Sequence, residues 1–299
     1  TMRNFPGKLM QTLLPFLSCC ALLMSTQVFA QSWPSAVPNL DCDRDCLIGV
    51  ADKFLDGLVS HDPAIVPWAE HVKFTENNVP LAIGDGIWGT ITGLGSYKLN
   101  AVDVSSGQVS FFGVVDEPAF SSLMALRLKV VHGLIAEAEM VVLRTIYEPK
   151  SIIWPEAVLE HKPVFYEILP EARRRPRERL ISIADGYFDT LQLNDGTLFT
   201  EFDDDCNRVE NGTRTTNNAS VDFTSVGALG CKEQFEQGNY RYDSALRARR
   251  FPLVDEERGL VLASGFIDHN GVLDEYTLSD GTLIKSPLRF PHSFYLLEL

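Results

Sequence analysis

The sequence predicts an α+β protein built from two tandem copies of one domain, and three observations carry this prediction. The stretches "ADKFLDGLVSHDP" (51–63) and "ADGYFDTLQLNDG" (184–196) share alanine, aspartate and leucine at positions 133 apart. In both, apolar residues recur every three or four positions, which indicates an amphipathic helix. Both helices precede β-branched and aromatic runs broken by glycine or proline, which indicate antiparallel strands. A period of this length is typical of a duplicated domain.

The elements follow in the same order in each copy. Helices are expected around residues 47–58 and 180–191. The expected strands are "KLNAVDV", "QVSFFGVV", "LMALRLKVV" and "AEMVVLR" in the first copy, and "FPLVD", "GLVLASGFIDH", "LDEYTLS" and "FPHSFYLLEL" in the second. The last run breaks off at Leu299, so we expect the natural protein to be longer and a closing strand to be missing here.

A further repeat joins "KFTENN" (73–78) to "NRVENG" (207–212), where Glu76-Asn77 align with Glu210-Asn211. We interpret both as the same early strand position of the two copies. Two functional sites or two copies of a fold-maintaining bond explain the repeat equally well. A third interpretation is that one copy is a site and the other a scaffold.

The expected organisation is a signal peptide at 1–30, a first domain at 40–145, a proline-rich segment at 146–178 and a second domain at 179–299. The segment 146–178 keeps several large apolar side chains, whose burial would stabilise the protein by about 1.5–3 kcal/mol each. We therefore expect it to lie across the surface of one domain. The basic run "EARRRPRER" (171–179) is expected to be a solvated linker or a helix start.

The N-terminus has the pattern of an export signal. Arg3 and Lys8 precede the apolar run "LLPFLSCCALLM", and Val28-Phe29-Ala30 fits a cleavage site that leaves Gln31 first. An alternative is a bacterial lipoprotein signal, which "LSC" resembles. In both cases the protein is exported, to the periplasm or beyond the cell. No later run reaches the roughly 18 apolar residues of a membrane span, so we expect no membrane contact after signal cleavage.

Four cysteines remain after cleavage, and an exported chain can oxidise them. Cys206 and Cys231 bracket a loop of the second copy and are the expected pair, while Cys42 and Cys46 can close a small ring beside the first helix. A zinc site is the weaker alternative, because neither pair has zinc-knuckle spacing and no histidine is close. We expect no metal.

The composition is that of a globular chain, with 45% hydrophobic and 22% charged residues. The formal net charge of −14 repels nucleic acid and anionic membrane surfaces, so we expect neither as a partner. A small aromatic or apolar molecule is the expected partner, and the formation of a homo-oligomer is left open. "NGT" and "NAS", at Asn211 and Asn218, are glycosylation sequons if the source is eukaryotic.

Several stretches carry a resemblance to a known family. They are "RDCLIGVADKFLDGLVSHDP", "GDGIWGTITGLGSYKL", "FFGVVDE", "DCNRVENGTRTTNN", "CKEQFEQG" and "FPLVDEERGLVLASGFIDHNG". With the helix-then-sheet order, residues 40–299 resemble a tandem, exported subgroup of the NTF2-like (SnoaL-like) superfamily, which includes ketosteroid isomerase. The resemblance implies two cone-shaped domains, each with helices on a curved antiparallel sheet.

The subgroup is related to the sphingomonad diarylpropane lyase. That resemblance implies a lyase that needs no cofactor and releases formaldehyde from a lignin-derived 1,2-diaryl-propane-1,3-diol. A noncatalytic exported ligand-binding protein and a ketosteroid-isomerase-like isomerase or dehydratase are the alternatives, since fold does not fix function. The sequence also lacks the dinucleotide, phosphate-loop, zinc-protease and serine-hydrolase motifs. Catalysis would therefore rest on side-chain acids, bases and hydrogen-bond donors.

Candidate site residues lie in both copies. In the first, the candidate catalytic residues are Glu76, Tyr97, Arg127 and Lys129, and the candidate substrate-binding residues are Asn77, Asp85, Trp88 and Arg144. In the second, His269 is the catalytic candidate, and Arg208, Glu210 and Asn211 are candidates for substrate binding.

Each candidate has a plainer alternative. Arg127 and Lys129 share one strand face, so they serve an interface or solvent if that face is the convex one. Arg208 and Glu210 are two apart on a strand and fit a structural salt bridge. His269 fits a surface position or a core histidine with its hydrogen bonds satisfied.

Overall fold

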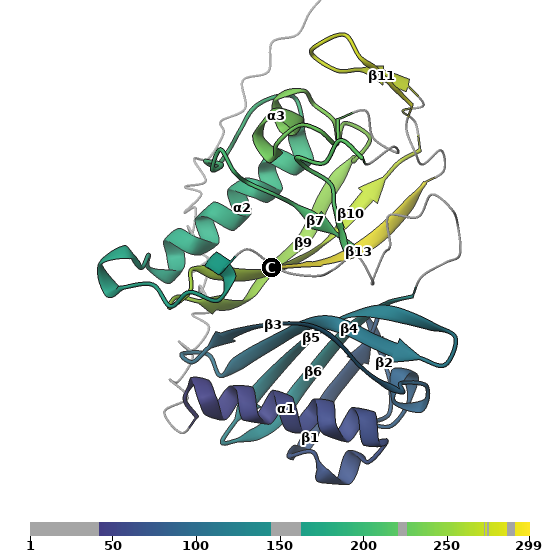
Figure 1. Cartoon of the computed structure of the whole chain (residues 1–299), viewed down its shortest axis with the longest axis vertical. Helices are drawn as coiled ribbons and strands as arrows, with labels where there is room; N and C mark the ends of the chain where they lie inside the picture. The colour runs from purple at the N-terminus through teal and green to yellow at the C-terminus, as the bar shows by residue number, and fades with distance from the viewer. Residues whose placement is uncertain (1–41, 145–162, 221–225, 272, 274, 286–290) are drawn as a thin grey trace, which may run out of the picture. The chain divides into compact units, whose positions relative to one another are not determined.

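The computed structural model describes residues 42–144, 163–220, 226–271, 273, 275–285 and 291–299, and residues 36–299 belong to one compact unit. The α+β class is confirmed: in each half a long helix precedes a sheet (Figure 1). The predicted signal peptide, and the part of segment 146–178 that contains Ile152 and Trp154, lie outside the described residues. No helix within the described ranges is long and apolar enough to cross a membrane.

The first half consists of one long helix, two short 3-10 turns and six strands. Its elements are α1 (Arg44–Ser60), η1 (Pro63–Ile65), β1 (Trp68–Glu76), β2 (Val79–Pro80), η2 (Gly86–Gly89), β3 (Gly93–Asp103), β4 (Gln108–Glu117), β5 (Phe120–Val131) and β6 (Leu134–Arg144). The sheet order is β2-β1-β6-β5-β4-β3. Neighbours are antiparallel except β1 and β6, which pair in parallel, a departure from the expected meander.

Helix α1 forms where the sequence predicts it and covers one face of this sheet (Figure 1). The Asp43 side chain caps the helix by accepting a hydrogen bond from the Cys46 amide at 3.0 Å, and His61 ends it in a left-handed conformation. The apolar stripe of α1 meets buried side chains of β4, β5 and β6 in one continuous core.

The second half has two helices and two short 3-10 turns beside smaller sheets. Its elements are η4 (Pro163–Phe165), η5 (Glu171–Arg173), α2 (Arg177–Leu193), β7 (Val209–Glu210), β8 (Thr213–Arg214), α3 (Cys231–Glu236), β9 (Ala245–Asp255), β10 (Leu260–His269), β11 (Glu275–Thr277), β12 (Leu283–Lys285) and β13 (His292–Glu298). Strands β13, β10 and β9 form an antiparallel sheet that α2 contacts through β9 and β10.

The repeated Glu-Asn motif forms the same β-hairpin turn in both halves. Glu76 pairs with Val79 across β1 and β2, and Glu210 pairs with Thr213 across β7 and β8. The two residues between them have positive φ in each case: 49° and 65° in the first half, 51° and 88° in the second. Asparagine and glycine tolerate this conformation best, which explains why the motif is written twice.

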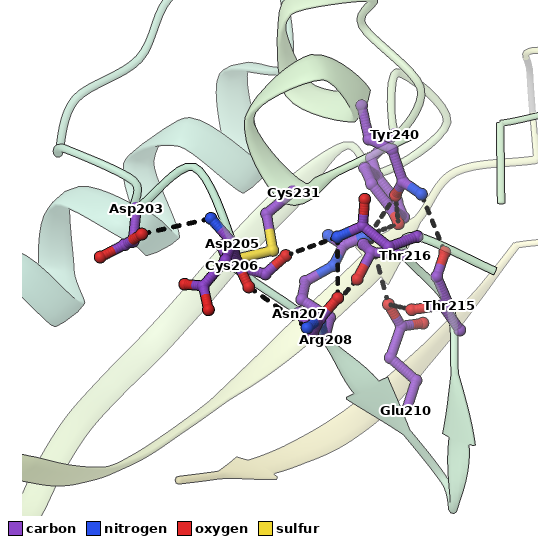
Figure 2. Close-up of a disulfide and its surroundings, with 12 residues drawn as sticks. Asp203, Asp205, Cys206, Asn207, Arg208, Glu210, Thr215, Thr216, Cys231 and Tyr240 are labelled. Carbon is purple, nitrogen blue, oxygen red and sulfur yellow. Dashed lines mark hydrogen bonds and ion pairs between the residues drawn. A yellow bond between two sulfur atoms is a disulfide. The ribbon is translucent and has the colours of Figure 1, made fainter. Parts of the chain in front are cut away.

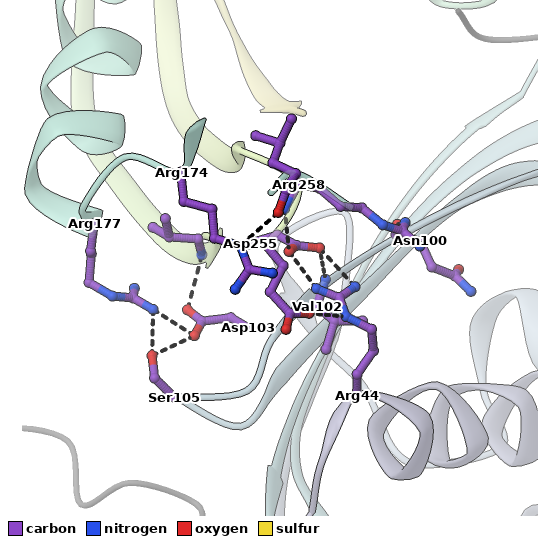
Figure 3. Close-up of polar contacts among 12 residues, drawn as sticks. Arg44, Asn100, Val102, Asp103, Ser105, Arg174, Arg177, Asp255 and Arg258 are labelled. Carbon is purple, nitrogen blue, oxygen red and sulfur yellow. Dashed lines mark hydrogen bonds and ion pairs between the residues drawn. The ribbon is translucent and has the colours of Figure 1, made fainter. Parts of the chain in front are cut away.

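A reciprocal pair of buried aspartates joins the two halves (Figure 3). Asp103, at the end of β3, accepts a hydrogen bond from the Val254 amide at 3.0 Å, and Asp255, at the end of β9, accepts one from the Val102 amide at 3.0 Å. Each aspartate also binds an arginine from the N-terminus of the opposite helix: Arg177 contacts Asp103 at 2.6 Å and Arg44 contacts Asp255 at 2.5 Å. The two copies therefore pack with the self-complementary contacts of a twofold dimer.

Candidate functional site

The interior of the first half is occupied by its own side chains. Trp88 is 2% exposed and packs edge-on against Phe54, with ring centroids 5.7 Å apart. It lies in a cluster of buried apolar residues that runs from α1 to β6. Trp88 is therefore part of the core between helix and sheet, where a ligand was expected.

Glu76 and Asn77 both satisfy backbone groups. A Glu76 carboxylate oxygen accepts a hydrogen bond from the Ile87 amide at 2.8 Å. The Asn77 side chain bonds the Val142 amide at 2.9 Å and the Val142 carbonyl at 3.1 Å. Of the interpretations that the sequence leaves open for the Glu-Asn repeat, these contacts favour two copies of a fold-maintaining bond.

The remaining candidates of the first half lie on separate elements. Asp85 is exposed at the start of η2, and its side chain makes no capping hydrogen bond. Tyr97 is buried on β3 in a small cluster with Leu99, apart from the main core. Arg144, on β6, binds Glu117 at 2.8 Å and forms a longer ion pair with Glu76 at 3.8 Å. Glu76 and Arg144 therefore meet, in an ion-pair cluster that also includes Glu117.

Arg127 serves the contact between the halves, the interface alternative set out above. Its neighbours in sequence, Leu126 and Leu128, point into the α1 core, so Arg127 faces the other side of the sheet. There it binds Glu139 at 2.9 Å. Glu139 in turn accepts hydrogen bonds from Tyr295 at 2.7 Å and from Arg250 at 2.8 Å, both in the second half. Lys129 lies on the same strand, only partly buried.

Ionisable and aromatic side chains gather instead in the second half, around Arg208 (Figure 2). Arg208 is 8% exposed, and its guanidinium lies 4.6 Å from the Tyr240 ring centroid and 5.0 Å from that of Phe235. It donates to the Tyr240 hydroxyl and to the Gln234 side chain, and Glu210 lies 3.5 Å away. The salt bridge expected between Arg208 and Glu210 therefore exists inside a larger cluster.

Local structure fixes Arg208 in place. Its amide donates to the Thr216 hydroxyl at 2.9 Å, and its carbonyl accepts from the Thr215 amide at 3.0 Å. The disulfide between Cys206 and Cys231 ties this segment to the start of α3. A second disulfide joins Cys42 to Cys46. Two disulfides are typical of a protein from an oxidising, extracellular environment.

Glu298 supplies the carboxyl of this cluster. It lies on β13, is partly buried, and has the Tyr187 hydroxyl of α2 close enough to lower its pKa. Burial raises the pKa of Glu298 to about 7; Arg208 and Tyr187 oppose this rise and the negative charge of Glu210 adds to it. The carboxyl therefore keeps its proton to a higher pH than an exposed glutamate does.

The tyrosines of the cluster stay protonated. Burial raises the pKa of Tyr187 well above its ordinary value, and the charge of Glu298 adds to the effect. Burial likewise raises the pKa of Tyr240, with Glu210 as the next cause. Burial lowers the pKa of Arg208, but Tyr240, Tyr187 and Glu210 outweigh it, so Arg208 remains a cation. The Arg208 cation and the Tyr187 hydroxyl therefore act on the carboxyl, while the Tyr240 hydroxyl donates to the Gln234 side chain at 3.1 Å.

His269 and Asn211 lie outside this constellation. His269 is 2% exposed, accepts a hydrogen bond from the Gly271 amide at 3.0 Å and stacks on His292 with centroids 5.0 Å apart. Burial lowers its pKa, which is the behaviour of the core histidine left open by the sequence. Asn211 is an exposed turn residue. Among the residues that the structure describes, no group of three or more His, Cys, Asp or Glu side chains could hold a metal ion.

Three central residues were missed from sequence, namely Glu298, Tyr187 and Tyr240. Glu298 had a visible signal, because "FYLLEL" places one carboxyl in an otherwise apolar strand. Tyr187 lies in the repeated stretch 184–196, which predicted a helix and no site. No local pattern marked Tyr240.

Two halves, each with a helix packed on a sheet, and an aromatic, ionisable cluster in the second half define a tandem α+β protein. The chain belongs to the family described as Domain of unknown function (DUF8021), which it matches over residues 41–142 and 173–298. No curated protein matches the sequence. Among solved structures it is similar to the "putative ketosteroid isomerase from Kribbella flavida DSM 17836", at 16% identity over 40% of this chain and 91% of that chain, with a TM-score of 0.26.

Proposed function

We propose that the second half is an acid–base site that transfers a proton to and from a small, oxygen-bearing aromatic or apolar molecule, with the first half as its scaffold. The observation that carries the proposal is the partly buried Glu298 carboxyl on β13, whose pKa the Tyr187 hydroxyl and the Arg208 cation both affect. A carboxyl with a pKa of about 7 can both accept and release a proton at neutral pH.

The surrounding groups have complementary roles. Tyr187 and Tyr240, held protonated, donate hydrogen bonds to an oxygen on which negative charge develops. Arg208 stabilises the same charge without moving, because its position is fixed by Gln234 and the nearby disulfide. Phe235, which is 1% exposed, packs against the Arg208 guanidinium and supports it from the core. No step of this chemistry needs a cofactor.

The specific reaction we propose is cleavage of a 1,2-diaryl-propane-1,3-diol to a stilbene, formaldehyde and water. On a substrate whose benzylic ring carries a para-phenolate, Glu298, protonated, assists departure of the benzylic hydroxyl as water and gives a neutral quinone methide. The carbon–carbon bond to the terminal hydroxymethyl group then breaks, its electrons return to the ring system, and the hydroxyl proton passes to the Glu298 carboxylate as formaldehyde leaves. Atoms and charge balance, and Glu298 ends as it began.

The test compares the wild-type protein with Glu298→Gln and with Glu201→Gln, an exposed glutamate of the same half as the control. Formaldehyde and stilbene absorbance are followed with the diol, and mass spectrometry follows an unsaturated ketone for isomerisation or water loss. We expect turnover that falls at least about 100-fold in Glu298→Gln only. Release of formaldehyde identifies the lyase, and a product of unchanged mass identifies an isomerase.

A ligand-binding protein without catalysis is the rival function. A ligand that raises the melting temperature, stays chemically unchanged over hours and binds Glu298→Gln as tightly as wild type would contradict the acid–base proposal.

A further inference from the structure

A second buried carboxyl, Asp243, lies beyond the Arg208 cluster. It sits in the turn between α3 and β9, is 8% exposed, and has one carboxylate oxygen with no hydrogen-bond partner among the described residues. No cation from the described ranges forms an ion pair with it. Buried carboxyls without hydrogen-bond partners are rare, because removing such a group from water without a compensating hydrogen bond destabilises the folded protein. Asp243 is thus a candidate for contact with something outside the chain.

A row of aromatic rings connects Asp243 to Glu298. From Tyr187, which lowers the pKa of Glu298, the ring centroids step 5.7 Å to Phe235, 5.7 Å to Tyr240 and 6.1 Å to Tyr242, the neighbour of Asp243. Phe235 is 1% exposed, whereas Tyr187, Tyr240 and Tyr242 are each partly accessible. The three tyrosines therefore present the accessible rings between the two carboxyls, with Tyr187 and Tyr240 packed on Phe235.

We propose that Asp243 is a second binding residue of this site: uncharged, it donates a hydrogen bond to an ether or carbonyl oxygen at the far end of the ligand. This deepens the proposed function by naming the substrate class, an elongated molecule of two aromatic rings with an acceptor oxygen on the ring remote from Glu298. A carboxyl in such surroundings favours its neutral form, which alone can donate to an acceptor that has no proton.

The ionisable groups around Asp243 support the neutral form. Burial, and then the negative charge of Glu210 on β7, raise the pKa of Asp243 to about 7. Tyr242, beside it, and Tyr276 of β11 are uncharged, since burial and Asp243 raise the pKa of both hydroxyls. Arg241 is exposed and binds the Thr277 carbonyl, and His269 of β10, whose ring packs at a tilt against Tyr242, has a lowered pKa. None of these groups is a buried cation that would hold the carboxylate form.

The test uses two probes that differ only at the far ring, trans-4-hydroxystilbene and trans-4-hydroxy-4′-methoxystilbene. Their dissociation constants are measured by stilbene fluorescence at pH 5.5 and pH 8.5. The ratio of the two dissociation constants cancels effects that are common to both probes, including the titration of Glu298. We expect the methoxy probe to bind about 5–10-fold more tightly at pH 5.5, and the advantage to vanish at pH 8.5, where Asp243 is ionised.

Three variants complete the design. Asp243→Asn keeps a donor at every pH, so the advantage should persist at pH 8.5. Asp243→Leu should lose it at both pH values, and Asp204→Asn, an exposed aspartate of the same half, should behave as wild type. An affinity ratio that does not change with pH in wild type, or one that Asp243→Leu leaves intact, overturns the proposal. If Asp243→Leu does not fold, the proposal is still tested by Asp243→Asn, in which the affinity ratio of the two probes should no longer depend on pH. Binding is read without turnover, so failure here is separate from failure of the acid–base chemistry.

Discussion

Replacing Asp255 by alanine should destabilise the whole protein, because this side chain is fully buried where the two halves meet. It accepts hydrogen bonds from Arg44 at 2.5 and 3.1 Å and from the amides of Val102 at 3.0 Å and Arg258 at 3.2 Å. The variant leaves a buried amide without an acceptor and a largely buried guanidinium with one partner instead of two.

The size of the effect follows from these contacts. Breaking a buried ion pair by removing one partner costs about 3–5 kcal/mol. Arg44 retains Glu257 at 2.5 Å, which offsets part of this, whereas the orphaned Val102 amide adds about 1–3 kcal/mol. A net loss of about 4 kcal/mol corresponds to a melting temperature lower by about 10 °C in a chain of this size.

The assay is thermal unfolding by circular dichroism at pH 7, with Glu257→Ala as the matched comparison. Glu257 binds the same arginine, but its side chain is 40% exposed, so its loss should cost at most about 1 kcal/mol. If Asp255→Ala melts within about 2 °C of wild type, or no lower than Glu257→Ala, the two halves do not depend on this contact and the reasoning fails.

Four further predictions concern single contacts. The pKa of Asp103 is lowered, since its arginine and amide partners outweigh the effect of burial, so the stability that its carboxylate contributes should be lost as pH falls below about 4. Asp103→Asn should then have the melting temperature of wild type at pH 3 and a lower one at pH 6. Replacing Cys206 and Cys231 by serine should cost about 3 kcal/mol by urea unfolding, and no change would mean that the bond is dispensable. Asp243 has a raised pKa, so it lowers stability between pH 4 and 7 as its unfolded counterpart ionises; Asp243→Asn should gain melting temperature relative to wild type at pH 8 but not at pH 4. Glu139→Gln should lower the unfolding free energy by about 1–3 kcal/mol and, on the proposed function, reduce kcat more than it raises KM, because Glu139 holds the strand that carries the proposed catalytic carboxyl; equal effects on both would refute the positioning role.

The helices and long strands could be predicted from sequence because their signals are local. The apolar stripe of α1 and the alternation of apolar and polar residues along β5 are both visible within a few residues of sequence. The same locality limited the site prediction. The parity of Arg127 put it opposite Leu126, but only the hydrogen bond between its partner Glu139 and Tyr295, distant in sequence, shows which face is the interface.

The repeated Glu-Asn motif shows a second limit. Asn77 and Asn211 looked like a duplicated site, yet they recur because a two-residue hairpin requires positive φ at both central positions. Conversely, the proposed site joins Tyr187, Arg208 and Glu298 from a helix, a loop and the last described strand. No single window of sequence contains that combination.

The reciprocal aspartate contacts have a consequence for how such a molecule behaves on dilution. In an ordinary homodimer, partners related in this way separate at low concentration, and both must carry identical surfaces. Here both partners belong to one polypeptide, so their effective concentration is fixed by covalent connection and each surface is free to diverge. One lobe can then fill its hollow with tryptophan and phenylalanine and give rigidity, while its twin keeps charged groups that would destabilise a lobe standing alone.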